Sequence, residues 1–204
     1  MRKYDAVFFD LDGTLSESGE GILWCVRRTI EDLKIVVPEN FRLESFIGPP
    51  LADSFYRLGL DDEKVKFGVK TYKSYYDTKG KYMNKAYDGI KELLERLREK
   101  GYKLGVATSK YELFARQIID NIGLLQYFDF VSGATANAER QKKIDVLNYG
   151  IKNLGATPEN SALIGDTKFD AEGARLCGCG FVGVLYGYGT VSYTHLRAHE
   201  TRSN

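Results

Sequence analysis

The sequence predicts an α/β protein in which a doubly wound parallel sheet carries an inserted helical module. Three observations predict this fold. The apolar run at residues 4–9 enters a glycine turn, as a fully buried first strand would. Residues 16–83 then show mostly helical spacing of apolar side chains. From Asp88 onward helix and strand patterns alternate, which is typical of a parallel sheet covered on both faces.

The first strand ends in the acidic sequence DLDGT at residues 10–14. Alternate residues of a strand point to opposite faces, so Asp10 and Asp12 lean to one side while Leu11 turns into the core. Two such charges about 4 Å apart repel by roughly 4 kcal/mol at an effective dielectric of about 20. A folded protein keeps such a pair for a compensating reason, such as a bound cation. The alternative is a strand followed by an ordinary acidic turn.

Residues 16–83 are interpreted as an inserted lid. Its first helix is predicted from apolar side chains at Ile22, Leu23, Val26, Ile30 and Leu33. The two prolines of the sequence IGPPL must break any helix and start another at Leu51. We expect Gly48, Pro49 and Arg57 to face the crevice and bind substrate. A rigid loop and a surface salt bridge are the structural alternatives.

The rest of the chain supplies the other elements of the sheet. Strands are predicted at residues 103–107, 128–131, 162–164 and 181–185, with helices between them. We therefore assign residues 1–15 and 84–190 to the core and residues 16–83 to the lid. Ligands of such a sheet bind outside the carboxyl ends of its strands.

Several polar side chains fall at that edge of the predicted sheet. They are Asp10, Asp12, Thr14, Thr108, Ser109, Lys142, Lys143, Asp166 and Asp170. Together they supply four carboxylates, hydroxyl groups and an ammonium group, which is the chemistry of phosphoryl transfer with a divalent metal.

Each of these residues also has a structural alternative. Thr108 and Asp170 are good helix caps, and Thr14 can hydrogen-bond the turn that contains it. Either Lys142 or Lys143 can be a solvated residue at the start of a helix.

Four short motifs indicate a family. DLDGT, Thr108 in VATSK, a lysine in RQKKIDV and GDTKFD resemble, in this order and spacing, the motifs of haloacid dehalogenase-like hydrolases. The resemblance covers roughly residues 3–190 and implies a Rossmann-like core. The helical insertion after the first motif resembles the cap of the branch that contains phosphoglycolate phosphatases, 5′-nucleotidases and beta-phosphoglucomutases.

The resemblance implies a role for each motif residue. Asp10 would be the nucleophile that forms an aspartyl phosphate, and Asp12 would act first as acid and then as base. Thr108 and the backbone amide of Ser109 would hold phosphoryl oxygens, with Thr14 also assigned to substrate binding. A lysine would neutralise charge on the phosphate and on Asp10. We prefer Lys143 over Lys142, because members of this branch commonly have the sequence KxDV at this position.

The resemblance also implies a magnesium site. Asp10 and Asp166 would bind Mg²⁺ through carboxylate oxygens and Asp12 through its backbone carbonyl. Asp170 would be a further ligand or would hold one of the ligands in place.

The expected function is a Mg²⁺-dependent phosphatase of small phosphomonoesters, such as phosphoglycolate or a nucleoside monophosphate. One alternative is a beta-phosphoglucomutase-like phosphosugar mutase, in which the phosphoryl group returns to the sugar. Another is a dehalogenase, which would need neither Asp12 as acid nor a metal. A third is a non-catalytic phospho-acceptor or binding protein.

Composition narrows the class of partner. The formal net charge is only +1, so the composition does not indicate a basic surface that would bind nucleic acid or an anionic membrane. No apolar stretch approaches the ~20 residues that span a bilayer. The three cysteines suggest neither a disulfide framework nor a zinc site, and we read them as small buried hydrophobes. We expect a cytoplasmic monomer or homodimer that acts on a small phosphorylated metabolite.

The C-terminal residues have a different character. Residues 191–201, VSYTHLRAHET, match one reading-frame translation of a transposase-type sequencing adapter. We therefore expect residues 191–204 to be an artefactual, disordered tail. His195 and His199 have a spacing that suggests a metal site, but the adapter origin argues against that interpretation.

Overall fold

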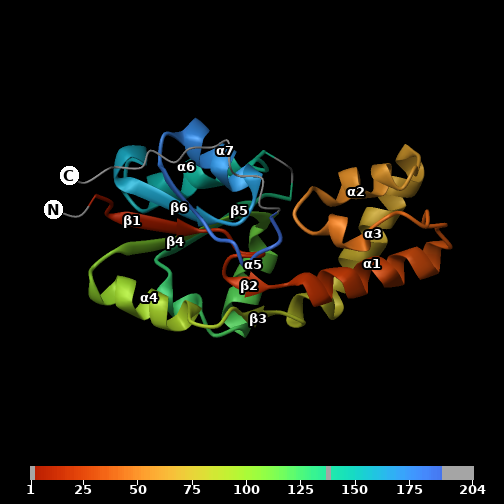
Figure 1. Ribbon diagram of the computed structural model, residues 1–204, viewed down its shortest axis with the longest axis horizontal. Helices are drawn as coiled ribbons and strands as arrows, with labels where there is room; N and C mark the ends of the chain where they lie inside the picture. Colours follow the sequence, from red (N-terminus) through yellow and green to blue (C-terminus); the bar gives the residue numbers. More distant parts are fainter. Residues whose placement is uncertain (1–2, 137–138, 190–204) are drawn as a thin grey trace. The chain divides into compact units, whose positions relative to one another are not determined.

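The computed structural model describes residues 3–136 and 139–189 (Figure 1). The predicted tail, with His195 and His199, lies outside the described residues. The chain divides into two compact units, one of residues 17–85 and the other of the segments before and after it. We call the first the helical unit and the second the sheet unit.

The sheet unit is built on parallel strands in the order β5-β4-β1-β6-β7. In that order the strands are Phe130–Ala134, Lys103–Tyr111, Ala6–Phe9, Ser161–Gly165 and Gly180–Gly183. Phe9 pairs in register with Val106 of β4 and with Ile164 of β6. The segments that follow these three residues therefore meet at one edge of the sheet.

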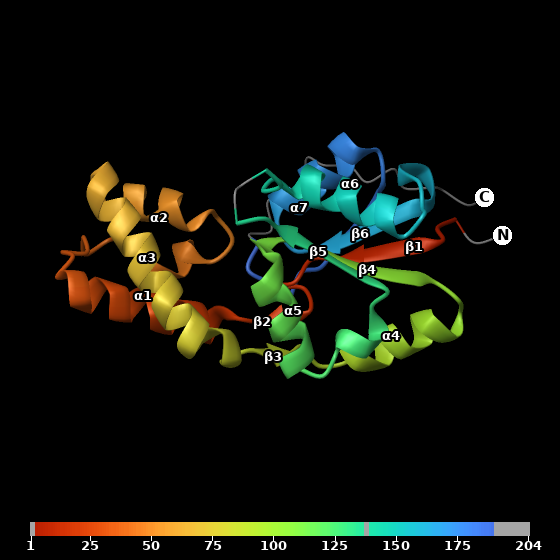
Figure 2. The same cartoon turned by 180° about the vertical axis from the view of Figure 1, so that it is seen from behind.

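Helices cover both faces of this sheet. Helices α6 (Lys143–Asn153) and α7 (Lys168–Cys177) lie on one face, while α4 (Ile90–Glu99) and α5 (Glu112–Asn121) lie on the other (Figures 1 and 2). Short 3-10 turns at Leu125–Tyr127 and Pro158–Asn160 precede β5 and β6. The predicted doubly wound α/β fold is confirmed.

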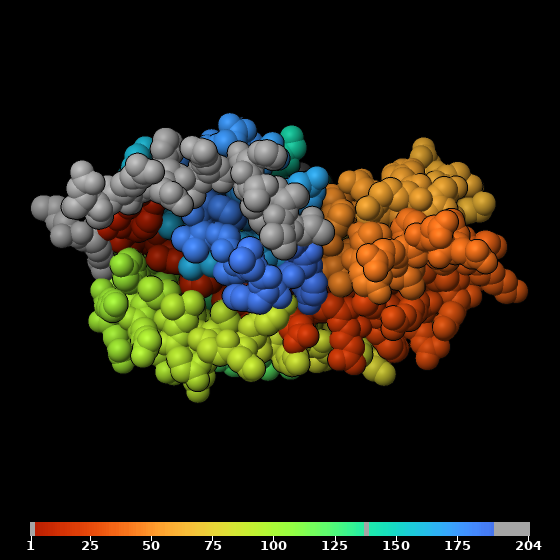
Figure 3. Space-filling model, in the orientation of Figure 1, coloured from red at the N-terminus to blue at the C-terminus, as the bar shows by residue number. Residues whose placement is uncertain are grey.

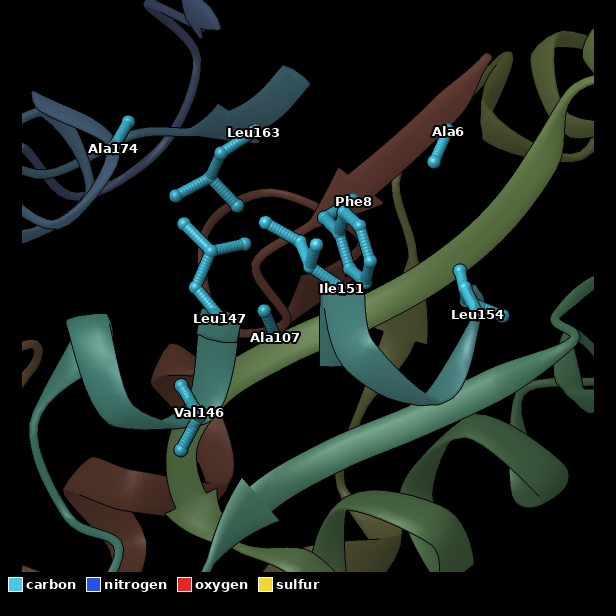
Figure 4. Close-up of a cluster of buried hydrophobic side chains, with 9 residues drawn as sticks. All are labelled: Ala6, Phe8, Ala107, Val146, Leu147, Ile151, Leu154, Leu163 and Ala174. Atoms are coloured by element: carbon cyan, nitrogen blue, oxygen red, sulfur yellow. The ribbon is translucent and has the colours of Figure 1, made fainter. Parts of the chain in front are cut away.

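Phe8 of β1 belongs to the hydrophobic cluster between the sheet and α6 (Figure 4). Its ring is fully buried and lies beside Leu147 and Ile151 of α6. Gly105 of β4 and Gly150 of α6 leave the space that the ring occupies, because a Cβ atom at these positions would lie 2.4 and 2.7 Å from it. Two glycines therefore let the helix and the strands close around one aromatic side chain.

Replacing Phe8 with alanine is expected to lower the free energy of unfolding by about 3–5 kcal/mol. The cavity would stay open, because Gly105 and Gly150 carry no side chain that could fill it. Urea unfolding followed by circular dichroism measures the loss. Phe67→Ala is the matched control, because Phe67 is 56% exposed, and it should change stability by less than about 1 kcal/mol. Equal losses in the two variants would contradict a central packing role for Phe8.

The helical unit contains α1 (Gly19–Leu33), α2 (Leu51–Arg57) and α3 (Asp62–Thr78), with 3-10 turns at Leu43–Phe46 and Gly80–Tyr82. Short strands β2 (Ser16–Glu17) and β3 (Lys85–Ala86) pair at its two ends. As predicted, a helix starts at Leu51 directly after the two prolines. Over the described ranges, no helix combines the length and apolar character needed to cross a membrane.

Two local predictions are wrong. Strand β4 continues to Tyr111 instead of ending at Ala107, because its pairing shifts register after Ala107 and resumes between Tyr111 and Ala134.

Cys25 is buried as predicted, but Cys177 and Cys179 are only partly buried. Cys177 is the last residue of α7 and Cys179 follows the Gly178 cap, and both pack against the edge of the hydrophobic cluster.

Candidate active site

The loop after β1 brings two carboxylates to the edge of the sheet. The amide of the buried Asp10 donates to the Ile164 carbonyl of β6 at 2.9 Å, which extends the strand pairing by one residue. Leu11 turns into the core as predicted, and its carbonyl accepts hydrogen bonds from the amides of residues 14–16. Gly13 turns the chain with a φ of +89°, a conformation that favours glycine.

Lys143 is the buried ammonium group of the site. Its Nζ lies 2.6 Å from Asp10 Oδ1 and 2.8 Å from Asp170 Oδ1, and it donates to the Ala107 carbonyl at 2.9 Å. Burial lowers the pKa of Lys143, but attraction to the two carboxylates outweighs burial and raises the pKa above its ordinary value. Lys142 caps the helix start and is exposed. The lysine that faces the site is therefore Lys143.

Asp10, Asp166 and Asp170 form a cluster of buried carboxylates. One oxygen of each lies within 4.8 Å of the others. Burial raises the pKa of Asp10, although Lys143 opposes the rise, and burial likewise raises the pKa of Asp166. Three carboxylates lie beside one ammonium group, so a further cation would balance the charge of the cluster. Carboxylate oxygens are the ligands that Mg²⁺ prefers. The donor set therefore fits the predicted metal.

The carboxylate of Asp12 has a different partner. Its Oδ2 lies 3.0 Å from Lys110 Nζ, whereas its Oδ1 is buried without a hydrogen-bond partner in the described part of the chain. Asp10 and Asp12 are thus each paired with a lysine of their own. Sequence reasoning missed Lys110, although it follows Thr108 and Ser109 directly.

Asp166 is held by hydrogen bonds at both oxygens. The Thr14 hydroxyl donates to Oδ1 at 3.3 Å, so it does not serve the turn that was its structural alternative. The amides of Tyr188 and Gly189 donate to Oδ2 at 2.7 and 3.2 Å. Sequence reasoning missed these two donors, because a backbone amide carries no residue-type signal.

Asp170 is the third residue of α7, so it is not the N-cap itself, but the prediction that it helps to cap the helix is confirmed. Thr167 is the N-cap, and its amide and hydroxyl donate to Asp170 Oδ2 at 2.9 and 2.7 Å. The other oxygen faces Lys143. One carboxylate thus stabilises the helix start and contributes charge to the site.

Thr108 and Ser109 lie at the same edge of the sheet. They follow Ala107, whose carbonyl accepts from the site lysine. Thr108 is buried, and its hydroxyl accepts from the Lys110 amide at 3.2 Å. It does not cap α5, whose N-cap is Tyr111. Ser109 is exposed.

Gly48, Pro49 and Arg57 belong to the helical unit. Arg57 donates to the Ser45 carbonyl at 2.7 Å and to the Ser54 hydroxyl at 2.8 Å. These hydrogen bonds explain the position of the guanidinium group without a salt bridge. The loop before α2 turns at Gly48, which has a φ of +104°. A role of the three residues in substrate binding stays a prediction.

Known proteins resemble this chain in sequence and in fold. A 5′-nucleotidase from Pseudomonas aeruginosa is 37% identical over 199 residues, which are 97% of this chain and 89% of that protein. Tyrosine-protein kinase PtkA from Mycobacterium tuberculosis is 36% identical over 187 residues, or 92% of this chain, which spans only 64% of the kinase. The crystal structure of a predicted phosphatase from Clostridium acetobutylicum has a TM-score of 0.85 and 37% identity, covering 93% of this chain and 88% of that one.

The family match covers most of the chain. Residues 7–184 match the family model of the haloacid dehalogenase-like hydrolases. This range contains all four motifs that suggested the family from the sequence. The resemblance is confirmed: the chain belongs to the haloacid dehalogenase-like hydrolases.

Proposed function

We propose that this chain is a Mg²⁺-dependent phosphatase that hydrolyses small phosphomonoesters through an aspartyl phosphate on Asp10. The observation that carries the proposal is the contact between Asp10 and Lys143, 2.6 Å apart among buried carboxylates. The ammonium group orients Asp10 for attack and offsets the negative charge of an incoming phosphate. Similarity to a 5′-nucleotidase and to a predicted phosphatase supports this chemistry.

The first step transfers the phosphoryl group to the protein. A bond forms between an oxygen of Asp10 and phosphorus, and the bond from phosphorus to the leaving oxygen breaks. Asp12 gives its proton to the leaving oxygen. Lys110 holds one oxygen of Asp12, and the other is buried without a hydrogen-bond partner among the described residues, which leaves it available for this transfer.

The second step releases phosphate. Asp12 takes a proton from a water molecule, whose oxygen bonds to phosphorus while the bond to Asp10 breaks. Thr108 and the amide of Ser109 hold the phosphoryl oxygens in both steps, because they follow Ala107 of β4 at the edge of the sheet where Asp10 lies. Lys143 stays protonated throughout and stabilises the charge that develops on phosphorus and on Asp10.

Asp10, Asp166 and Asp170, with the Asp12 carbonyl, would hold Mg²⁺. When bound, Mg²⁺ supplies a Lewis acid that polarises the phosphoryl oxygens and offsets the charge of the carboxylates.

Removing divalent metal with EDTA is expected to reduce phosphate release from p-nitrophenyl phosphate by at least ~100-fold, because such metal ions contribute several kcal/mol. Excess Mg²⁺ should restore the rate, whereas excess Na⁺ of matched ionic strength should not. Undiminished phosphate release in EDTA would contradict the metal dependence that the proposal requires.

We assign substrate selection to the helical unit, as a cap that contributes Gly48, Pro49 and Arg57. Rates with a panel of phosphoglycolate, nucleoside monophosphates, hexose phosphates and pyrophosphate identify the preferred substrate. We expect phosphoglycolate or a nucleoside monophosphate to have the highest kcat/KM. Formation of a sugar phosphate isomer without phosphate release would instead identify a phosphosugar mutase.

A second candidate is phosphoryl transfer to protein tyrosine, because the chain resembles PtkA over 92% of its length. The chain spans less than two thirds of that kinase, so the similarity does not extend to the whole protein. Incubation with radiolabelled ATP distinguishes the two functions. A phosphatase releases phosphate from small esters, whereas a kinase leaves label on tyrosine of an acceptor protein.

A further inference from the structure

The described chain ends in a glycine- and tyrosine-rich segment, residues 186–189, that contacts the candidate site. It follows β7 and belongs to the last described part of the chain, drawn in blue at the surface in Figure 3. The Tyr188 amide donates to Asp166 Oδ2 at 2.7 Å, and the Gly189 amide donates to the same oxygen at 3.2 Å. With the Thr14 hydroxyl on Oδ1, these donors fix the direction of the carboxylate.

Gly187 is in contact with the same residues. A Cβ atom at this position would lie 2.3 Å from the Gly13 carbonyl oxygen and 2.4 Å from both Cβ and Oδ2 of Asp166. Neither the backbone carbonyl nor a short buried carboxylate can move away easily. A side chain at residue 187 would therefore displace Asp166 or the loop after β1.

Tyr186 attaches the segment to the loop after β1. Its hydroxyl donates to the Thr14 carbonyl at 2.9 Å, and its ring packs against Tyr87 with ring centroids 4.7 Å apart. Val184, just before the segment, donates from its amide to the Gly165 carbonyl at 2.9 Å. The segment is thus anchored at the loops that follow both β1 and β6.

We propose that residues 186–189 position Asp166 for metal binding. The inference rests on the proposed function, because it assumes that Asp166 is a ligand of Mg²⁺. A carboxylate held in one orientation before the metal arrives loses no further rotational freedom on binding, so the affinity is higher than for a mobile side chain. Residues 186–189 are positioning residues, because they act through Asp166.

The test compares Gly187→Ala with Gly183→Ala in the full chain. Gly183 lies four residues earlier, and an added Cβ atom would make only an ordinary contact of 3.4 Å with the Phe181 ring. Isothermal titration with MgCl₂ gives the dissociation constant for Mg²⁺, and thermal unfolding in EDTA gives the stability of the metal-free protein. We expect Gly187→Ala to weaken Mg²⁺ binding by at least about 10-fold, as loss of a supporting contact does in other metal sites, and Gly183→Ala to leave it unchanged.

A merely structural role would give a different result. It would lower the melting temperature of metal-free Gly187→Ala while leaving its Mg²⁺ dissociation constant unchanged, and that result would overturn the inference. If Gly187→Ala does not fold, Tyr186→Phe replaces it, because this variant loses only the hydroxyl that holds Thr14. An unchanged Mg²⁺ affinity in Tyr186→Phe would then overturn the inference. Wild-type protein that binds Mg²⁺ but hydrolyses no phosphomonoester would refute the proposed function and leave the positioning role intact.

Discussion

Asp10→Asn is expected to abolish phosphate release, with a loss of roughly 10⁴-fold or more, as removal of a catalytic nucleophile does in other hydrolases. The asparagine amide has nearly the same shape as the carboxylate, so the loop after β1 keeps its backbone hydrogen bonds. It lacks the anionic oxygen that would attack phosphorus. Initial rates with p-nitrophenyl phosphate and Mg²⁺ measure the effect, and acid quenching tests for a phosphorylated protein.

Asp120→Asn is the matched control for this variant. It makes the same chemical change on an exposed position of α5, and its rate should stay within about twofold of wild type, as for a surface change. Wild type should give an acid-stable, hydroxylamine-sensitive phosphoprotein that Asp10→Asn does not form. Equal rates for Asp10→Asn and wild type would exclude Asp10 as the nucleophile.

Lys143→Met should impair both stability and activity. The ammonium group contacts Asp10, Asp170 and the Ala107 carbonyl, so its removal leaves two buried carboxylates without their cation. Breaking such a buried pair costs about 3–5 kcal/mol. Loss of the charge that stabilises the transition state should lower kcat by about 10²- to 10³-fold. Urea unfolding in EDTA and steady-state rates in Mg²⁺ measure the two effects separately.

The adjacent Lys142→Met makes the same replacement one residue earlier. Lys142 is exposed, so this variant should unfold within about 0.5 kcal/mol of wild type and keep its rate. If the two methionine variants behaved alike, Lys143 would not be the lysine of the site. Excess Mg²⁺ should restore part of the stability of Lys143→Met, because a ligand that binds only the folded state stabilises it.

Local sequence patterns predicted the parts of the site that depend on residue type and strand order. Asp10 is predictable because it follows the last residue of an apolar strand, β1. Asp166 is predictable for the same reason, because it follows the last residue of β6. Their approach follows from the register of β1 and β6, which parallel topology requires once the strands are known. The residue pattern left Lys142 and Lys143 open, and the family resemblance favoured Lys143, which the structure places beside Asp10.

The contacts that sequence reasoning missed depend on long-range geometry. Lys110 reaches Asp12 because β4 continues past Ala107 with a shift in register, and such a shift has no strong signal in one sequence. The amides of Tyr188 and Gly189 reach Asp166 because the chain turns back after β7. The double role of Asp170 was predictable, because a carboxylate near a helix start can cap it, but the N-cap itself is Thr167, three residues earlier.

The central position of β1 in the sheet affects how the protein folds during synthesis. In the chain β1 precedes both of its neighbours in the sheet, β4 and β6, which are translated much later. Pairings between such distant segments form slowly, and an unaccompanied apolar strand invites aggregation. A nascent chain that already carries Asp10 therefore has neither Lys143 nor Asp166 beside it. The carboxylate cluster and its lysine can therefore come together only after the segment up to Asp170 has been synthesised.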